Sequence, residues 1–223
     1  MYRLGPPMYK VDLCHLGDAC APGIIIDEIL NIRKKTLFML GIYKFNDILN
    51  YLTEGNYENI YNKEHLYIDL HVKHRQYNFV FNHDYLFKDN AITNYDFIKD
   101  RFDLKIKNFK ETLAKPGTTV YINFTSMFDR LNINEMCAWL DNNTHSYHLI
   151  IFTDNADSYE IQEHQLSVIK ISKFSGWWLF TPENKVILYR EIYEKFIKCL
   201  NDTHTDHDFP QTFEETYYGQ NQN

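Results

Sequence analysis

Three short apolar runs, alternating with helical patterns, constrain the fold of this chain more than any other sequence feature. The runs are TTVYINF at residues 118–124, SYHLIIFTD at 146–154 and LSVIKIS at 166–172. Strands that are buried on both faces have continuous apolar runs of this kind. Helical patterns precede, separate and follow them at residues 94–114, 133–143 and 184–200. We therefore predict an α/β fold with a central, mostly parallel or mixed sheet flanked by helices; the alternative is a papain-like α+β fold.

The first half of the chain contains less regular patterns. Residues 9–16 alternate in polarity, which predicts a short strand ending at Gly17, and a helix is expected to follow over residues 18–35. A second helix is predicted over residues 43–52, ending near Gly55. Residues 65–73 and 76–82 look like the two strands of a hairpin.

Length and composition predict one folded unit. The chain has 223 residues, 44% of them hydrophobic, which is enough for a core. We expect a single α/β domain over residues 9–200 and a flexible polar tail over residues 201–223. The 17 Tyr and 16 Phe residues, together with frequent Asn, Ile and Lys, are typical of an AT-rich genome such as that of a large DNA virus, a protist or a low-GC bacterium.

Charge and targeting signals exclude several classes of partner. A net charge of −7 disfavours general binding to nucleic acid, because phosphate contacts need clustered Lys and Arg. No run reaches the roughly 18 apolar residues of a membrane helix, and the N-terminus lacks the apolar core of a signal peptide. The four cysteines are scattered without a CxxC pair, as expected in a reducing compartment. We expect a cytoplasmic protein with neither a nucleic-acid nor a membrane partner.

Cys20 is the first candidate for chemistry. It lies at a predicted strand–turn–helix junction, just before the first helical turn. The positive end of a helix dipole lowers the pKa of a nearby thiol and so favours the reactive thiolate. A small buried residue in the same turn is the alternative interpretation.

His83 is the second candidate. It follows a predicted strand, and a neutral imidazole there could take the proton of a nearby thiol and later return it to a leaving group. Asp84 could orient the ring or cap the next turn, since neighbours on a strand point to opposite faces. Asp84, Asn123 and Asp154 are all candidates for a third catalytic residue, and we prefer Asp84.

The segment His15-Leu-Gly-Asp-Ala-Cys20 resembles the opening SLGxxC signature of a papain-like cysteine peptidase family. The similarity continues in order through Arg33-Lys34, the His83-Asp84-Tyr85 segment and the helix-like DRFDLKIKNF at residues 100–109, and covers roughly residues 10–125. That family usually has Ser where His15 stands, and PFDW where this chain reads LFML at residues 37–40.

The resemblance implies a cysteine-dependent hydrolase or transferase that acts on a peptide or other acyl bond. Cys20 would be the nucleophile and His83 the base. The expected partner is a peptide or protein substrate, and no cofactor or metal is expected. The alternative is an inactive relative that serves as a binding or structural module, for example in a viral particle.

Two other groups of residues suggest different functions. His65, His71 and His74 could suggest a metal site, but strand alternation would place His71 and His74 on opposite faces, and no zinc-type spacing supports one. Trp177 and Asp154, both in predicted loops, could suggest carbohydrate binding, but a Trp in such a loop more often covers the core. The sequence contains no P-loop, dinucleotide glycine fingerprint, GxSxG or HExxH motif.

Overall fold

The computed structural model describes most of the chain between Asp12 and Thr203. The described residues are 12–17, 36–38, 41–81, 86–88, 91–126, 129–155, 161–163, 165–172 and 181–203. The predicted helix at residues 18–35 and the polar tail from residue 204 onward lie outside them.

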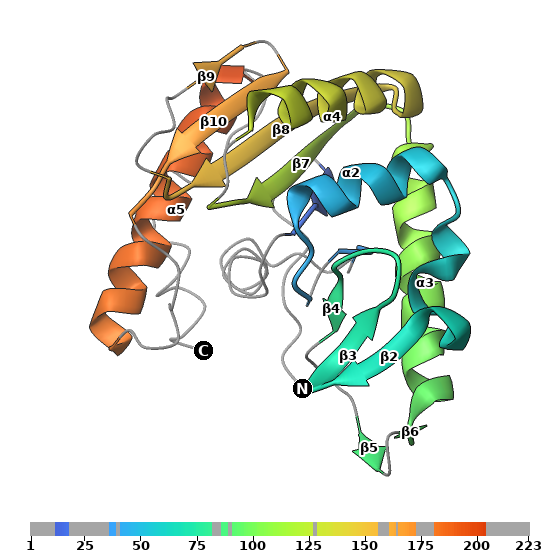
Figure 1. Cartoon of the computed structure of the whole chain (residues 1–223). Helices are drawn as coiled ribbons and strands as arrows, with labels where there is room; N and C mark the ends of the chain where they lie inside the picture. The colour runs from blue at the N-terminus through green and yellow to red at the C-terminus, as the bar shows by residue number, and fades with distance from the viewer. Residues whose placement is uncertain are drawn as a thin grey trace, which may run out of the picture.

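The predicted α/β architecture is confirmed by a five-stranded sheet (Figure 1). Its strand order is β1-β7-β8-β10-β9. The first four strands of this order are parallel to one another, and β9 is antiparallel to β10. The five strands are β1 (Asp12–His15), β7 (Thr118–Phe124), β8 (Ser146–Thr153), β9 (Ile161–Gln162) and β10 (Leu166–Lys170). The described residues thus form the α/β arrangement and not the α+β alternative.

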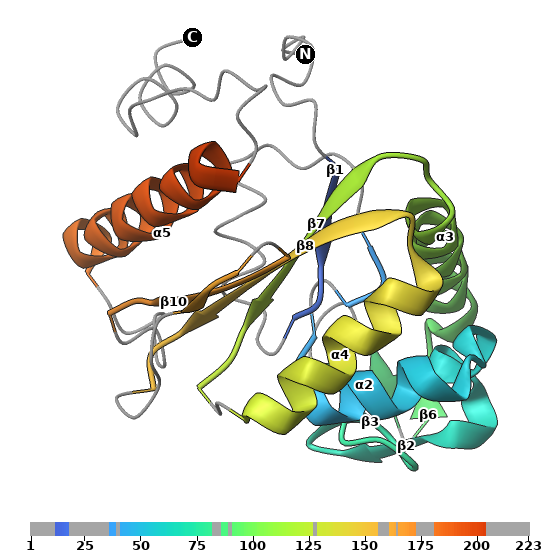
Figure 2. The ribbon, with the colours of Figure 1, turned by 90° about the horizontal axis from the view of Figure 1, so that it is seen from above.

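Helices cover both faces of this sheet (Figure 2). Helix α5 (Pro182–Thr203) lies on one face. On the other side lie α2 (Phe45–Glu54), α3 (Tyr95–Leu113) and α4 (Arg130–Asn143). Because both faces are covered, the central strands must be apolar on both sides, which explains the continuous apolar runs in the sequence.

Alternation along β7 and β8 separates two hydrophobic clusters. Val120, Ile122 and Phe124 pack with α5, whereas Tyr121 joins the cluster under α4. Strand β8 alternates in the same way: Ile150 and Phe152 pack in the cluster with α5, and Leu149 and Ile151 pack in the other cluster. The period of two in a β-strand therefore places one strand in both clusters.

The prediction for residues 65–82 is wrong in its division of strands. The segment from 65 to 73 forms not one strand but two, β2 (Leu66–Asp69) and β3 (His71–His74), which turn back at Leu70 with φ of 52°. From 76 to 82 the structure describes only the two-residue β4 (Val80–Phe81), which pairs with β3. The turn was missed because Leu rarely adopts positive φ and gives no turn signal.

Short elements complete this half of the chain. Two 3₁₀ helices, η1 (Tyr57–Tyr61) and η2 (Lys63–His65), precede β2. The pair β5 (Phe87–Lys88) and β6 (Ala91–Ile92) precedes α3. None of the described helices is both long and apolar enough to span a membrane.

Several element boundaries match the sequence patterns closely. Helix α2 ends at Gly55, whose φ of 70° is the left-handed conformation that glycine adopts without strain. Asp129 caps α4 by accepting from the Leu131 amide, and Asn132 donates to Asp129. Helix α5 extends to Thr203, into the segment predicted as tail.

Candidate functional site

The predicted catalytic residues Cys20, His83 and Asp84 lie outside the described residues, and so does Trp177. The structure does describe the residues that lead to them. Gly17 is three positions before Cys20 and follows β1. Phe81 is two positions before His83 and ends β4.

These two segments lead to the neighbouring residues Phe38 and Tyr43, Gly17 through the backbone of Phe38 and Phe81 through the ring of Tyr43. Gly17 lies against the Phe38 carbonyl, whose oxygen would be 2.8 Å from a Cβ placed on this glycine. The Phe38 ring is 6.3 Å from Phe79 and 5.6 Å from Tyr43, edge-on to both. Tyr43 in turn contacts the Phe81 ring, 6.1 Å away. Two segments more than 60 positions apart are thus brought to one cluster.

His15 is a buried histidine at the carboxyl end of β1, next to this cluster. Its side chain is 2% exposed and stacks on Phe124 at 6.2 Å between ring centroids. Thr36 lies along its backbone, accepting from the His15 amide at 3.2 Å. Neither ring nitrogen has a hydrogen-bond partner among the described residues.

Burial sets the charge of His15. Removal from water lowers the pKa of its imidazole from 6.5 to about 4, and the nearby Phe38 carbonyl opposes this only in part. At neutral pH the ring is therefore uncharged, with one N–H donor and one acceptor. The sequence suggested His15 only as part of a motif, and its burial could not have been deduced from the residue type.

The other two candidates for a third catalytic residue lie at the same edge of the sheet. Asn123 of β7 is fully buried, and its amide donates to the Leu16 carbonyl next to the end of β1. Its side-chain oxygen has no hydrogen-bond partner in the part of the chain that the structure describes. Asp154 is half-buried directly after β8. The carboxyl ends of parallel strands are where α/β proteins usually hold their ligands.

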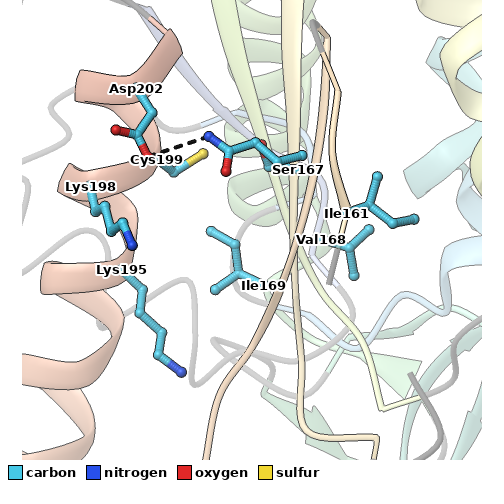
Figure 3. Close-up of a pocket in the computed structure, with 9 residues that line it drawn as sticks. Ile161, Ser167, Val168, Ile169, Lys195, Lys198, Cys199 and Asp202 are labelled. Atoms are coloured by element: carbon cyan, nitrogen blue, oxygen red, sulfur yellow. Dashed lines mark hydrogen bonds between the residues drawn. The ribbon is translucent and has the colours of Figure 1, made fainter. Parts of the chain in front are cut away.

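A second polar cluster lies between the sheet and α5, and two of its members line the cavity drawn in Figure 3. The His148 Nε2 atom is 2.9 Å from the Ser167 hydroxyl and 3.9 Å from the Cys199 sulfur, and all three side chains are buried. Ser167 and Cys199 also line a cavity of about 250 Å³ together with Lys195, Lys198 and other side chains of β9, β10 and α5. No local pattern in the sequence indicates this cluster, because its members are 19 to 51 positions apart.

The thiols described by the structure are not set up as nucleophiles. Burial raises the pKa of the Cys199 thiol to about 11, despite a hydrogen bond with Ser167 that lowers it. Burial also raises the pKa of Cys137, and Cys14 is fully buried in the core. A buried thiol with a raised pKa supplies little thiolate at neutral pH, so it reacts slowly in both acyl transfer and alkylation.

Of the three histidines suggested as metal ligands, His74 has a structural role. His74 is buried; its Nδ1 atom accepts from the amides of Gln76 and Tyr77, both at 3.2 Å, and its ring stacks on His65. His71 is exposed on β3. Across the described ranges, no three His, Cys, Asp or Glu side chains are grouped so that they could hold a metal ion.

No protein-family model, curated protein or solved structure matches this chain.

Proposed function

We propose that this protein is a cysteine-dependent hydrolase or transferase that acts on a peptide or other acyl bond, with Cys20 as nucleophile and His83 as base. Asp84 is the preferred residue to orient His83. One observation carries the proposal. Gly17, three positions before Cys20, lies against the Phe38 carbonyl, and Phe81, two positions before His83, contacts the Tyr43 ring beside Phe38.

Chain length makes the pairing feasible. Three residues from Gly17 to Cys20 reach at most about 11 Å, and two residues from Phe81 to His83 reach about 7 Å. Gly17 lies against the Phe38 carbonyl, and Phe81 contacts the Tyr43 ring, which packs against the Phe38 ring. Each reach is therefore long enough to bring its residue, Cys20 or His83, close to Phe38 and Tyr43.

The position of Cys20 in the chain also supports the proposal. It follows the carboxyl end of a parallel strand, where α/β sites gather. The sequence predicts a helix start just after it, and a helix N-terminus favours thiolate over thiol. Cys199 lies in the opposite environment, where burial raises its pKa. It is therefore a slowly reacting thiol in the same chain, against which the reactivity of Cys20 can be compared.

The proposed reaction proceeds through an acyl-enzyme. His83 takes the Cys20 proton, the sulfur attacks the carbonyl carbon, and the carbonyl electron pair moves to oxygen. When that pair returns, the bond to the leaving group breaks and the imidazolium of His83 protonates the departing atom. Water, or another acyl acceptor, then attacks the thioester and loses its proton to His83. The C–S bond breaks, the acyl product leaves, and the imidazolium of His83 returns the proton to the Cys20 sulfur, which restores the thiol.

The test is the rate of iodoacetamide alkylation at each of the four cysteines against pH, read by peptide mass mapping. We expect the alkylation rate of Cys20 to stay high below pH 7. In a His83→Ala variant, we expect the pH dependence of that rate to become that of an ordinary thiol. His71→Ala is the matched control, because His71 is an exposed histidine on β3. Cys199, with a pKa of about 11, should react at least about a hundredfold more slowly than an exposed thiol.

Two results would contradict the proposal. Cys20 could follow an ordinary thiol profile in the wild type, or it could fail to react in the folded protein. Either result would favour the alternative of a binding or structural module.

A further inference from the structure

Strands β2 and β6 lie near the start of α3 (Figure 1). A cavity of about 430 Å³ is lined by residues of these elements, of η2 and by Arg75. Its charged side chains are both cationic, Lys63 and Arg75. Two tyrosines, Tyr67 and Tyr95, contribute aromatic surface. The remaining lining residues are apolar: Leu66, Ile68, Ala91 and Ile92. A cavity with two cations and no lining acid is suited to an anion.

Each cation lies over one of the tyrosine rings. The Lys63 ammonium is 5.9 Å from the centre of the Tyr95 ring, and the Arg75 guanidinium is 5.7 Å from that of Tyr67. Within the described ranges neither cation has an acidic partner within ion-pair distance. Both donor groups are therefore held at the cavity with their charge uncompensated.

Other lysines in the same region are neutralised. Lys110 lies over the Tyr57 ring at 5.7 Å, in the same way as Lys63 over Tyr95, but it also pairs with Glu58. Lys73, on the strand next to β2, pairs with Asp69 at 2.7 Å. Lys63 differs from these two lysines in having no acidic partner among the described residues.

The aromatic wall is fixed before any ligand binds. The Tyr95 hydroxyl donates to the Tyr61 carbonyl at 3.0 Å and accepts from the Lys63 amide at 2.9 Å. Its ring also stacks on Tyr61, with centroids 5.6 Å apart. The Arg75 amide donates to the His65 carbonyl at 2.7 Å. A pre-organised site loses less conformational entropy when a ligand binds.

We propose that this cavity binds a small aromatic phosphate monoester of the nucleoside monophosphate class. The guanidinium of Arg75 suits the planar face of a phosphate, and Lys63 adds a second charge. The exposed Tyr67 ring and the apolar lining residues suit a planar base. The volume is near the lower end of known ligand sites, which fits a single nucleotide rather than a polymer.

The test is calorimetric titration of the full chain at low salt with three probes: AMP, adenosine and inorganic phosphate. AMP is expected to bind saturably, and adenosine and inorganic phosphate at least about tenfold more weakly, because each carries only half of the recognised chemistry. Arg75→Gln and Lys63→Gln are each expected to weaken AMP binding by at least about tenfold. Lys110→Gln is the matched control and should leave binding unchanged.

Exposed side chains are replaced in all three variants, so a thermal melt should show that each remains folded. The proposal is overturned if AMP shows no saturable binding up to millimolar concentration. It is also overturned if inorganic phosphate binds as well as AMP, or if Lys110→Gln weakens binding as much as Arg75→Gln. None of these outcomes depends on the reactivity of Cys20, so this site can be tested separately from the proposed catalysis.

Discussion

Replacing Phe38 with alanine tests the packing on which the proposed active site depends. The Phe38 ring is 1% exposed and lies edge-on to four aromatic rings at 5.6 to 6.3 Å, those of Tyr43, Tyr51, Phe79 and Phe109. These neighbours are themselves buried and hold one another in place, so they cannot collapse into the space that Phe38→Ala would leave.

The cost follows from burial and from the cavity. Transfer of a phenylalanine side chain from water contributes roughly 1.5 to 3 kcal/mol, and a cavity that does not close adds to the loss. Phe→Ala changes in well-packed cores cost about 3 to 5 kcal/mol. We take about 4 kcal/mol, the middle of that range. For a chain of this length, such a loss lowers the melting temperature by about 8 to 16 °C.

Urea unfolding followed by circular dichroism measures the free energy, and Phe97→Ala is the matched control. Phe97 is 63% exposed on α3, so its truncation should change the free energy of unfolding by no more than about 0.5 kcal/mol. If Phe38→Ala and Phe97→Ala lie within about 1 kcal/mol of each other, Phe38 is not packed as described. The segments that lead to Cys20 and His83 would then not be held together through Phe38.

Two further predictions use the same unfolding assay. The pKa of His15 is about 4 in the folded protein and 6.5 for an ordinary exposed imidazole, so the unfolded chain takes up the proton first as the pH falls. The free energy of unfolding is therefore unaffected by this group above pH 6.5 and falls by about 3 kcal/mol by pH 4. His15→Gln should remove that part of the acid sensitivity, and an unchanged pH slope would refute the assignment. Gly41→Ala should cost about 2 to 3 kcal/mol, the upper part of the range for overpacking, because its methyl group would overlap the buried Tyr43 ring. Gly55→Ala meets no atom within 4 Å and should cost only the left-handed conformation, about 1 kcal/mol; equal losses at the two glycines would contradict this contrast.

The central sheet could be predicted because local pattern and tertiary environment agree there. Strands β7 and β8 lie between helices on both faces, so every position favours an apolar residue. Helix α3 was equally clear, with Phe102, Ile106 and Phe109 on its buried side at helical spacing. In these elements one physical cause, burial, sets the whole pattern.

Elements formed by backbone pairing rather than by burial could not be predicted. Strand β9 has two residues and forms because it pairs with β10, which no local pattern indicates. The turn at Leu70 depends on β2 and β3 pairing at Asp69 and His71. Such pairings gain their stability from partners that a local window of sequence does not contain.

The candidate sites were predicted only where a motif was contiguous. Cys20 and His83 each stand in a recognisable local pattern, whereas the buried state of His15 depends on Phe124, more than 100 positions away. His148, Ser167 and Cys199 belong to three separate elements, and only folding brings them together.

Net charge and local charge lead to different conclusions about the partners of this chain. A total of −7 opposes binding along a nucleic-acid backbone, because such binding involves many phosphates over an extended surface. A single phosphate senses mainly the charges within a Debye length, about 8 Å at physiological ionic strength. At the cavity between β2 and α3 the lining charges are Lys63 and Arg75, and both are positive. An acidic protein can therefore hold a small anion at this point, and the binding should weaken as salt is added.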